Sequence, residues 1–170
     1  DIKALEAEAG KGNGITIEAE NEKTSFIYPI SQRPAVNTKE INVSWRPPYF
    51  GNGDWYLAVG GEYLTYNFNV LEDGKYNVWI RDYVDNFQAK GIRKVVVSFD
   101  GINYGTFAEN NSFVPSDNKK GVFAWHKVGN GVSLKVGFHT MKVMKEATTA
   151  GAALLDSFYL TTGSETPSEK

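Results

Sequence analysis

The chain has 170 residues, no cysteine and a formal net charge of -2, from 18 Lys+Arg against 20 Asp+Glu. A chain of this length fits one compact domain and can bury a core without disulfides, so the missing cysteine leaves the cellular compartment open. The near-neutral charge balance argues against nucleic acid or an anionic membrane as the main partner, because either would favour a basic excess. Aromatic residues make up 14% of the chain, and together with 17 Gly they indicate a β-rich domain with many tight turns.

Neither end of the chain carries a targeting signal. Asp1 is not followed by the basic and apolar regions of a signal peptide, and no apolar run approaches the ~20 residues needed to cross a bilayer. Residues 163–170 have no aromatic or aliphatic anchor, which is typical of a linker or tail. We therefore expect one domain over residues 1–162, taken from a longer protein.

Apolar and polar residues alternate in almost every apolar segment, which is the pattern of half-buried strands. The first strands are expected at 15–20 and 41–45. Residues 62–70 and 76–83 alternate on either side of a turn at 71–75. These two segments together predict an antiparallel hairpin.

A second hairpin is expected between 94–99 and 102–107, turned by Asp100-Gly101. Further strands are expected at 122–128, 132–136, 138–144 and 154–160. No segment keeps an apolar stripe with a helical repeat, although a helical turn is compatible with 145–155. Many short strands separated by turns predict an all-β fold, namely an antiparallel β-sandwich or jelly roll.

The sequence carries no motif of a common catalytic site. Both histidines, His126 and His139, fall inside expected strands, and there is no nucleophile elbow, zinc-binding His-Glu-x-x-His or phosphate-cradling loop. A pair of carboxylates for glycoside cleavage stays open, because their separation in space is invisible in sequence. A small all-β domain of this kind is more often a binding or accessory module than an enzyme, so we expect no catalytic activity.

Five aromatic residues crowd into 45–56, a segment broken by Pro and Gly. A loop with such large rings tucks them onto the core or offers them to a ligand. Sugar rings lie flat on aromatic faces, and their hydroxyls pair with polar side chains at the edges. The candidate ligand-binding residues here are Trp45, Tyr49, Asp54 and Trp55. The alternative is that the rings close one end of the sandwich.

A second candidate surface lies on the strand expected at 76–83. If Tyr76 and its alternate neighbours face the core, then Trp79, Arg81 and Tyr83 line the other face. A row of aromatic, basic and aromatic residues on an exposed sheet face would suit a saccharide. The alternative is that another segment or a partner domain covers this row.

Acidic residues give a third signal. Glu6 and Glu8 lie two apart, so in a strand both carboxylates project from the same side. Asp156 would point inward if Phe158 and Leu160 do, and an inward carboxylate needs a counter-charge. Oxygen ligands of this kind suit Ca²⁺. The alternative is exposure at the strand ends or pairing with Lys and Arg.

Seven short motifs follow one another along the chain. They lie at 5–10 (LEAEAG), 61–70 (GEYLTYNFNV), 73–81 (DGKYNVWIR), 95–101 (VVVSFDG), 123–128 (FAWHKV), 134–143 (LKVGFHTMKV) and 155–160 (LDSFYL). This order resembles the carbohydrate-binding modules of families 6 and 35, which have a galactose-binding-like β-jelly roll. The resemblance covers nearly the whole chain to about residue 162. It implies a non-catalytic, extracellular module that binds a polysaccharide or oligosaccharide and is attached to a secreted glycoside hydrolase or polysaccharide lyase.

The resemblance also implies site residues. Modules of these families often hold a structural Ca²⁺ between an opening Glu-x-Glu and the Asp of the last strand, which maps onto Glu6, Glu8 and Asp156. Glu18-Ala19-Glu20 is an alternative source of the first two ligands. The sugar cleft of these families lies at the loop end of the sandwich, where it would draw on Tyr49, Trp55 and Trp125.

A different class of function stays open beside this one. A structural or protein-contact β-sandwich domain of a larger extracellular protein would use the same aromatic residues as a domain interface and would bind no sugar. In either case we expect a monomer. Shielding of Trp79, Tyr83 and residues 45–56 by a neighbouring domain would distinguish this alternative from sugar binding.

Overall fold

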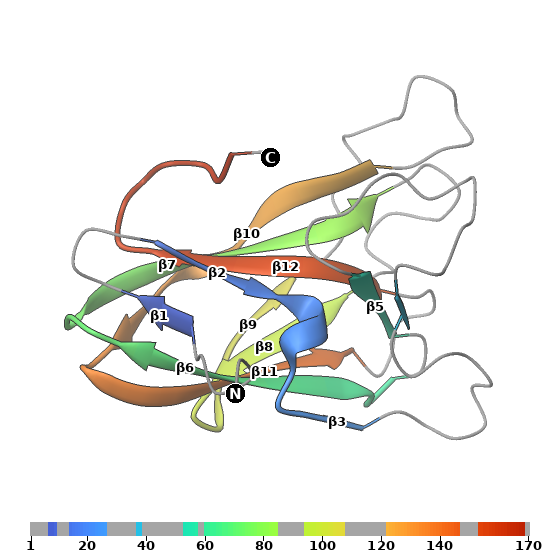
Figure 1. The fold of residues 1–170 in the computed structure, drawn as a ribbon, viewed down its shortest axis with the longest axis horizontal. Coiled ribbons are helices and arrows are strands. Elements are labelled where there is room, and N and C mark those ends of the chain that lie inside the picture. Colours follow the sequence, from blue (N-terminus) through green and yellow to red (C-terminus); the bar gives the residue numbers. More distant parts are fainter. Residues whose placement is uncertain are drawn as a thin grey trace.

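Strands make up most of the regular structure. The computed structural model describes residues 7–9, 14–26, 37–38, 53–57, 60–84, 94–107, 122–146 and 153–168. Its elements, labelled in Figure 1, are β1 (Ala7–Ala9), β2 (Ile15–Glu18), the 3-10 helix η2 (Ala19–Asn21), β3 (Thr24–Phe26), β4 (Asn37–Thr38), β5 (Gly53–Leu57), β6 (Tyr63–Val70), β7 (Gly74–Val84), β8 (Val95–Phe99), β9 (Ile102–Phe107), β10 (Val122–Leu134), β11 (Gly137–Lys145) and β12 (Ala153–Thr161). Within these ranges, no helix is long and apolar enough to cross a membrane.

The strands form two six-stranded sheets. The first sheet has the order β1-β6-β11-β8-β9, with β3 also paired to β6. The second has the order β10-β7-β12-β5-β4, with β2 also paired to β12. Among the described strands only β1 and β6 pair in parallel, and the other pairs are antiparallel. The two sheets lie one above the other in Figure 1, so the predicted all-β sandwich is confirmed.

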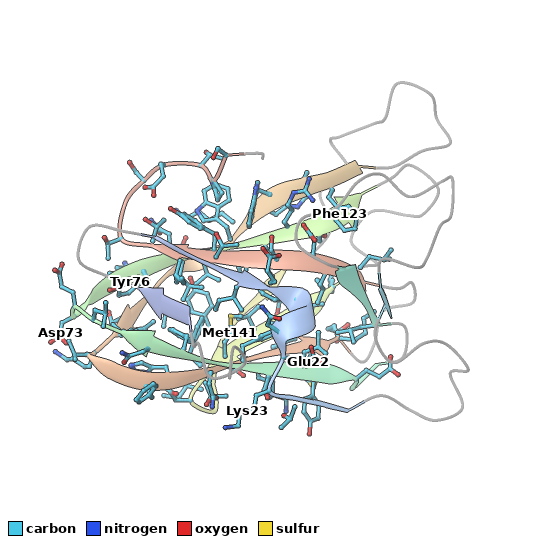
Figure 2. All side chains as sticks on the ribbon, in the orientation of Figure 1. Glu22, Lys23, Asp73, Tyr76, Phe123 and Met141 are labelled. Atoms are coloured by element: carbon cyan, nitrogen blue, oxygen red, sulfur yellow. The ribbon has the colours of Figure 1, made fainter. Side chains whose placement is uncertain are left out.

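The core lies between the two sheets. Every second residue of β6 is buried, as expected for a strand with one face on the core. The rings of Tyr66 and Phe158 meet across the interface with centroids 5.0 Å apart. The Tyr66 hydroxyl donates a hydrogen bond of 2.8 Å to the carbonyl oxygen of Ala19. Tyr76 and Met141, labelled in Figure 2, are fully buried and come from opposite sheets.

The hairpin predicted from residues 62–70 and 76–83 is wrong. β6 pairs with β1, β3 and β11 in the first sheet, whereas β7 pairs with β10 and β12 in the second. The turn between them, where Figure 2 labels Asp73, carries the chain from one sheet to the other. A short turn between two alternating segments suits either a hairpin or a corner of a sandwich, and partners distant in the sequence decide between them. The predicted inward face is nevertheless right, because Tyr76 and Ile80 are fully buried.

The second predicted hairpin is confirmed. β8 and β9 pair antiparallel, with Phe99 opposite Ile102. The two turn residues Asp100 and Gly101 have φ angles of 53° and 81°. Positive φ at both central residues is the signature of a two-residue hairpin turn of type I′, which is why Asp-Gly predicts it well.

The remaining expected strands form with small shifts. Residues 138–144 and 154–160 form β11 and β12, whereas the strand expected at 15–20 ends at Glu18 and continues as η2. Residues 41–45 and 147–152 lie outside the described residues. The alternation therefore predicts that a strand is present more reliably than it predicts the residues at which the strand begins and ends.

One bent strand, β10, replaces the two strands expected between 122 and 136. Its pairing with β7 is irregular between Val128 and Val132. Gly129 and Gly131 have φ angles of 62° and 100° there, in the left-handed region that favours glycine. The Tyr104 hydroxyl donates to the carbonyl oxygen of Val128 and accepts from the amide of Gly131, both at 2.8 Å. The bend therefore ties the edge of the second sheet to β9 of the first.

A histidine–aspartate pair joins β11 to the turn between β8 and β9. The Nδ1 atom of His139 lies 2.6 Å from Oδ2 of Asp100, and its Nε2 atom lies 2.7 Å from the carbonyl oxygen of Lys135. Carboxylate and carbonyl oxygens only accept hydrogen bonds, so both ring nitrogens carry a proton. Burial alone lowers the pKa of His139, but the hydrogen bonds with Asp100 and Lys135 and the charge of Asp100 outweigh it, and the pKa is raised.

We expect the stability that this pair provides to depend on pH. Because the pKa of His139 is raised on folding, its contribution is complete below the unfolded value of about 6.5 and is lost as the pH rises through the folded value. For Asp100, burial raises the pKa, but the hydrogen bonds with His139 and with the Thr140 amide outweigh it and the pKa is lowered. The contribution of Asp100 is therefore present above about pH 3.9 and lost as the pH falls through the folded value.

Urea unfolding measures this dependence. The free energy of unfolding of the wild type should fall between about pH 5.5 and about pH 8.5, and His139→Gln should show a smaller fall over the same interval. An equal fall in both proteins would contradict a charged His139.

Candidate functional site

One face of the second sheet gathers aromatic and charged side chains. Every second residue of β7 from Tyr76 to Asp82 is buried on the core side, so Asn77, Trp79 and Arg81 face away from the core. Arg81 lies opposite Trp125 of β10, and Trp79 lies opposite Tyr159 of β12. We call this surface the outer face. Its residues are Glu18, Trp79, Arg81, Phe123, Trp125, Ser157 and Tyr159.

An ion pair anchors the outer face to the sheet. Nη1 of Arg81 lies 2.9 Å from Oδ2 of Asp156, and the two side chains are only 8% and 0% exposed. The pairing of β12 with β7 shifts between Leu155 and Ser157. The extra residue interrupts the alternation that was expected to turn Asp156 inward, and Asp156 pairs with an arginine whose strand position faces away from the core. The predicted need for a counter-charge is met by Arg81.

The Arg81 guanidinium is also held from the side. Its carbon lies 5.4 Å from the ring centroid of Phe123, which is labelled at one end of β10 in Figure 2. A guanidinium at this distance from a ring face is attracted to the ring electrostatically, and the attraction is stronger where water is excluded. Arg81 is therefore fixed by a carboxylate and a ring together.

Three aromatic residues of the outer face keep part of their surface open. Trp79, Trp125 and Tyr159 are each partly exposed. The rings of Trp125 and Tyr159 meet edge to face, with centroids 6.3 Å apart. Nε1 of Trp79 is buried and has no hydrogen-bond partner among the described residues. What this face offers to a ligand is therefore the surface of the aromatic rings, since the Trp79 N–H lies beneath it.

The structure brings together four of the residues expected to bind ligand. Trp79, Arg81 and Trp125 belong to the outer face, and Tyr83 follows on β7, opposite Phe123. Arg81 is only 7% exposed, so it lies beneath the surface instead of forming an open platform. Arg81 is therefore better placed to position the neighbouring aromatic rings than to contact a ligand directly.

The other expected ligand residues belong to β5 or lie outside the described residues. Asp54 and Trp55 are in β5, opposite Asn37 and Leu155 respectively. β5 is the neighbour of β12 in the second sheet. Trp45 and Tyr49 lie outside the described residues.

Tyr159 is the residue that sequence reasoning missed. The alternation in β12 carried the signal, because Phe158 and Leu160 are fully buried in the core and the residue between them faces away. Its importance depends on its neighbours Trp79 and Trp125, which come from strands far away in the sequence. A single strand pattern does not contain that information.

A second histidine–aspartate pair lies on the core side of the same sheet. Nδ1 of His126 is 2.6 Å from Oδ1 of Asp82, and the two side chains are 13% and 3% exposed. His126 is opposite Ile80, which is fully buried, so the pair joins β10 to β7 at the margin of the core. Such a pair is only the base and the orienting group of a hydrolytic triad, which also needs a nucleophile.

Two of the acidic residues expected to bind calcium, Glu8 and Asp156, belong to different sheets. Asp156 is in β12 of the second sheet, whereas Glu8 is in β1 of the first sheet, opposite Asn69. Glu6 lies outside the described residues. In the part of the chain that the structure describes, no three acidic, His or Cys side chains gather as a metal site. The alternative residue Glu18 lies opposite Ser157, next to Asp156 in the chain.

Comparison with solved structures places this fold among carbohydrate-binding modules. The chain superposes on the GH26-CBM35 β-(1,4)-mannanase of Podospora anserina with a TM-score of 0.59 and 17% identity, covering 92% of this chain and 29% of the mannanase. It superposes on the CBM36-1 domain of a xylanase from the hindgut metagenome of Trinervitermes trinervoides with a TM-score of 0.58 and 13% identity, covering 90% of this chain and 100% of that domain.

A third similar structure is the CBM35 of Paenibacillus barcinonensis, with a TM-score of 0.58 and 18% identity, covering 87% of this chain and 98% of the module. A CBM36 in complex with calcium and xylotriose has a TM-score of 0.54 and 16% identity, covering 86% of this chain and 98% of that one. No family model and no curated protein matches the sequence. The chain thus spans less than a third of the mannanase but nearly the full length of isolated modules, and it has the β-sandwich fold of carbohydrate-binding modules 35 and 36.

Proposed function

We propose that the chain is a non-catalytic carbohydrate-binding module, monomeric, extracellular and attached to a carbohydrate-active enzyme. The fold that it shares with whole isolated modules supports this, as does the presence of the same fold within a longer mannanase. Tethering to a polysaccharide would raise the effective concentration of an attached enzyme at its substrate. The single observation that carries the proposal is the outer face, where partly exposed Trp79, Trp125 and Tyr159 lie together.

The chemistry of the outer face suits a sugar. Aromatic faces attract the C–H surfaces of pyranose rings, and sugar hydroxyls accept hydrogen bonds from donors such as the Tyr159 hydroxyl. Arg81 and Asp156, which are buried beneath, hold the strands that carry these rings. Trp45, Tyr49, Asp54, Trp55 and Tyr83 stay predicted ligand residues; β5, with two of them, lies in the same sheet.

Affinity electrophoresis of the full chain against mannan, xylan, α- and β-glucans and pectin tests the proposal. We expect retardation in at least one polysaccharide gel and unchanged mobility in a gel without polysaccharide. Identical mobility in all gels would contradict the proposal.

A protein-contact domain is the second candidate function. The observation that favours it is the exposure of Ile102, Val136 and Phe138, which are 73%, 61% and 72% exposed in this chain. Exposed apolar side chains of this size are common singly but mark an interface when they form one patch. If they do, Phe138→Ala should abolish binding to an attached domain and leave glycan retardation unchanged.

We also propose that calcium binds where β2 meets β12. Ca²⁺ takes six to eight oxygen ligands, and Glu18, Asp156 and Ser157 supply two carboxylates and a hydroxyl. The Oγ atom of Ser157 is buried and has no hydrogen-bond partner among the described residues. Asp156 pairs with Arg81 through Oδ2, and a carboxylate has a second oxygen that a cation can share. The calcium complex of a structural neighbour supports the choice of metal.

Calcium removal should lower the melting temperature. A ligand that binds only the folded state stabilises it by about 2.7 kcal/mol at a concentration a hundred times its dissociation constant. Chelation should therefore lower the melting temperature by several degrees, and added Ca²⁺ should restore it. Glu18→Gln should weaken this response, whereas Glu72→Gln, at an exposed turn, should keep it. An unchanged melt after exhaustive chelation would count against the calcium site.

A further inference from the structure

The chain turns back on itself after β12. Residues 162–168, which we call the strap, follow the last strand, and in Figure 1 this red segment runs on the side of the second sheet. The carbonyl oxygen of Gly163 accepts a hydrogen bond of 2.7 Å from Nδ2 of Asn77 on β7. The amide of Gly163 donates to Oγ1 of Thr161 at 3.0 Å. The segment expected to be a tail is therefore attached to the sandwich at its beginning.

Glu165 attaches the strap to the outer face itself. Its Oε2 atom accepts hydrogen bonds from the Tyr159 hydroxyl at 3.1 Å and from the Thr161 hydroxyl at 2.8 Å. Tyr159 is the residue whose ring meets Trp125 and whose strand position is opposite Trp79. One carboxylate oxygen thus occupies two hydroxyl donors at the edge of the aromatic surface.

The position of Tyr159 is fixed from the other side as well. A Cβ atom added to Gly14 would clash with the Tyr159 hydroxyl, so glycine at this position leaves room for the tyrosine as it stands. Thr161 is only 3% exposed, although its strand position, opposite Asn77, faces away from the core. The strap and its neighbours therefore cover this end of the outer face.

We propose that Glu165 is an internal competitor for the glycan, holding the hydroxyl donors of Tyr159 and Thr161 until a sugar replaces it. This inference rests on the proposed function. A sugar oxygen that lies over the Trp125–Tyr159 pair would accept from the same hydroxyls that Glu165 occupies. The strap is exposed at Glu165 and joined to the face through few side-chain bonds, so it can leave without unfolding the sandwich.

The ionisation of the two partners agrees with this contact. The hydrogen bond from Thr161 is the largest cause of a lowered pKa of the Glu165 carboxyl, so the group is an anion at neutral pH. Burial, followed by the hydrogen bond and the charge of Glu165, raises the pKa of Tyr159. The tyrosine thus keeps its proton and remains a donor for Glu165 or for a sugar.

Calorimetric titration of the full-length wild type, Glu165→Ala and Thr166→Ala with the polysaccharide that retards the wild type tests the proposal. We call the form in which Glu165 contacts Tyr159 and Thr161 closed, and the form without these contacts open. If only the open form binds sugar, the apparent association constant of the wild type is reduced by the fraction of molecules that are open. Removing Glu165 should therefore raise this constant, by about three- to tenfold. Thr166→Ala, on the same exposed segment, should bind as the wild type does. Glu165→Gln, which keeps the length but loses the charge, should lie between the wild type and Glu165→Ala.

Acrylamide quenching of Trp fluorescence gives a reading without sugar. Quenching should increase in Glu165→Ala, because the strap no longer covers the end of the aromatic surface, while circular dichroism should show the same fold. If the wild type binds the polysaccharide and Glu165→Ala has an unchanged or lower association constant, the role of Glu165 as a competitor is wrong and the proposed function stands. Absence of binding by every variant, with increased quenching in Glu165→Ala, would overturn the proposed function and the competitor with it.

Discussion

Replacing Asp156 by alanine should destabilise the fold by about 3–5 kcal/mol, because the substitution leaves the Arg81 guanidinium buried without its counter-charge. The carboxylate is fully buried and lies 2.9 Å from the guanidinium, which is itself only 8% exposed. Solvent screens such a pair weakly, so its loss costs far more than that of a surface pair. Urea unfolding at neutral pH measures the difference.

The double substitution Arg81→Met with Asp156→Leu distinguishes the loss of the counter-charge from the loss of side-chain packing. Replacing both partners of a buried ion pair by apolar residues of similar size is often close to neutral, so the double variant should be more stable than Asp156→Ala. The loss in Asp156→Ala should also persist after chelation, because the buried arginine lacks the Asp156 carboxylate with or without calcium. A cost below about 1 kcal/mol would contradict the buried pair as a main support of this sheet.

Replacing Trp125 by alanine should lower the association constant for the bound glycan by about thirtyfold, which corresponds to about 2 kcal/mol. The substitution removes the ring itself and the edge that supports Tyr159, whose centroid lies 6.3 Å away. Because Trp125 is partly exposed, the loss of stability should be small enough for the folded protein to be titrated.

Two further variants sharpen this test. Trp79→Phe keeps an aromatic ring but reduces its surface, so it should weaken binding less than Trp125→Ala. Phe138→Ala is the matched control, since it removes an aromatic ring that is 72% exposed on the first sheet. A glycan affinity that falls in Phe138→Ala and not in Trp125→Ala would place the sugar elsewhere.

Much of the fold could be predicted from the period-two alternation, because alternation is a local property. It identified β6, β7, β8, β9, β11 and β12, and the inward faces of β6 and β7. It did not reveal that β6 and β7 belong to different sheets, since the same turn serves a hairpin and a sandwich corner. Nor did it reveal the bend at Gly129 and Gly131. These glycines suggest a turn, but a single strand pairs with β7 on both sides of a register shift there.

The candidate site could be predicted only in part. Alternation in β7 placed Trp79 and Arg81 on one face, as the structure does. The burial of Arg81 depends on Asp156, and this contact depends on an irregularity in β12 that no residue type signals. Glu18 lies beside Asp156 because β2 pairs with β12, a contact between segments almost 140 residues apart in the chain. Pairing between strands so far apart in the sequence depends on the packing of the whole sandwich, so the sequence of one segment does not predict it.

Isothermal titration of the full chain with a panel of soluble polysaccharides and oligosaccharides tests whether the outer face binds sugar. We expect saturable binding to at least one member of the panel, weakened about thirtyfold in Trp125→Ala and unchanged in Phe138→Ala. Binding to no member of the panel, by a wild-type protein with a cooperative thermal melt, would contradict this expectation.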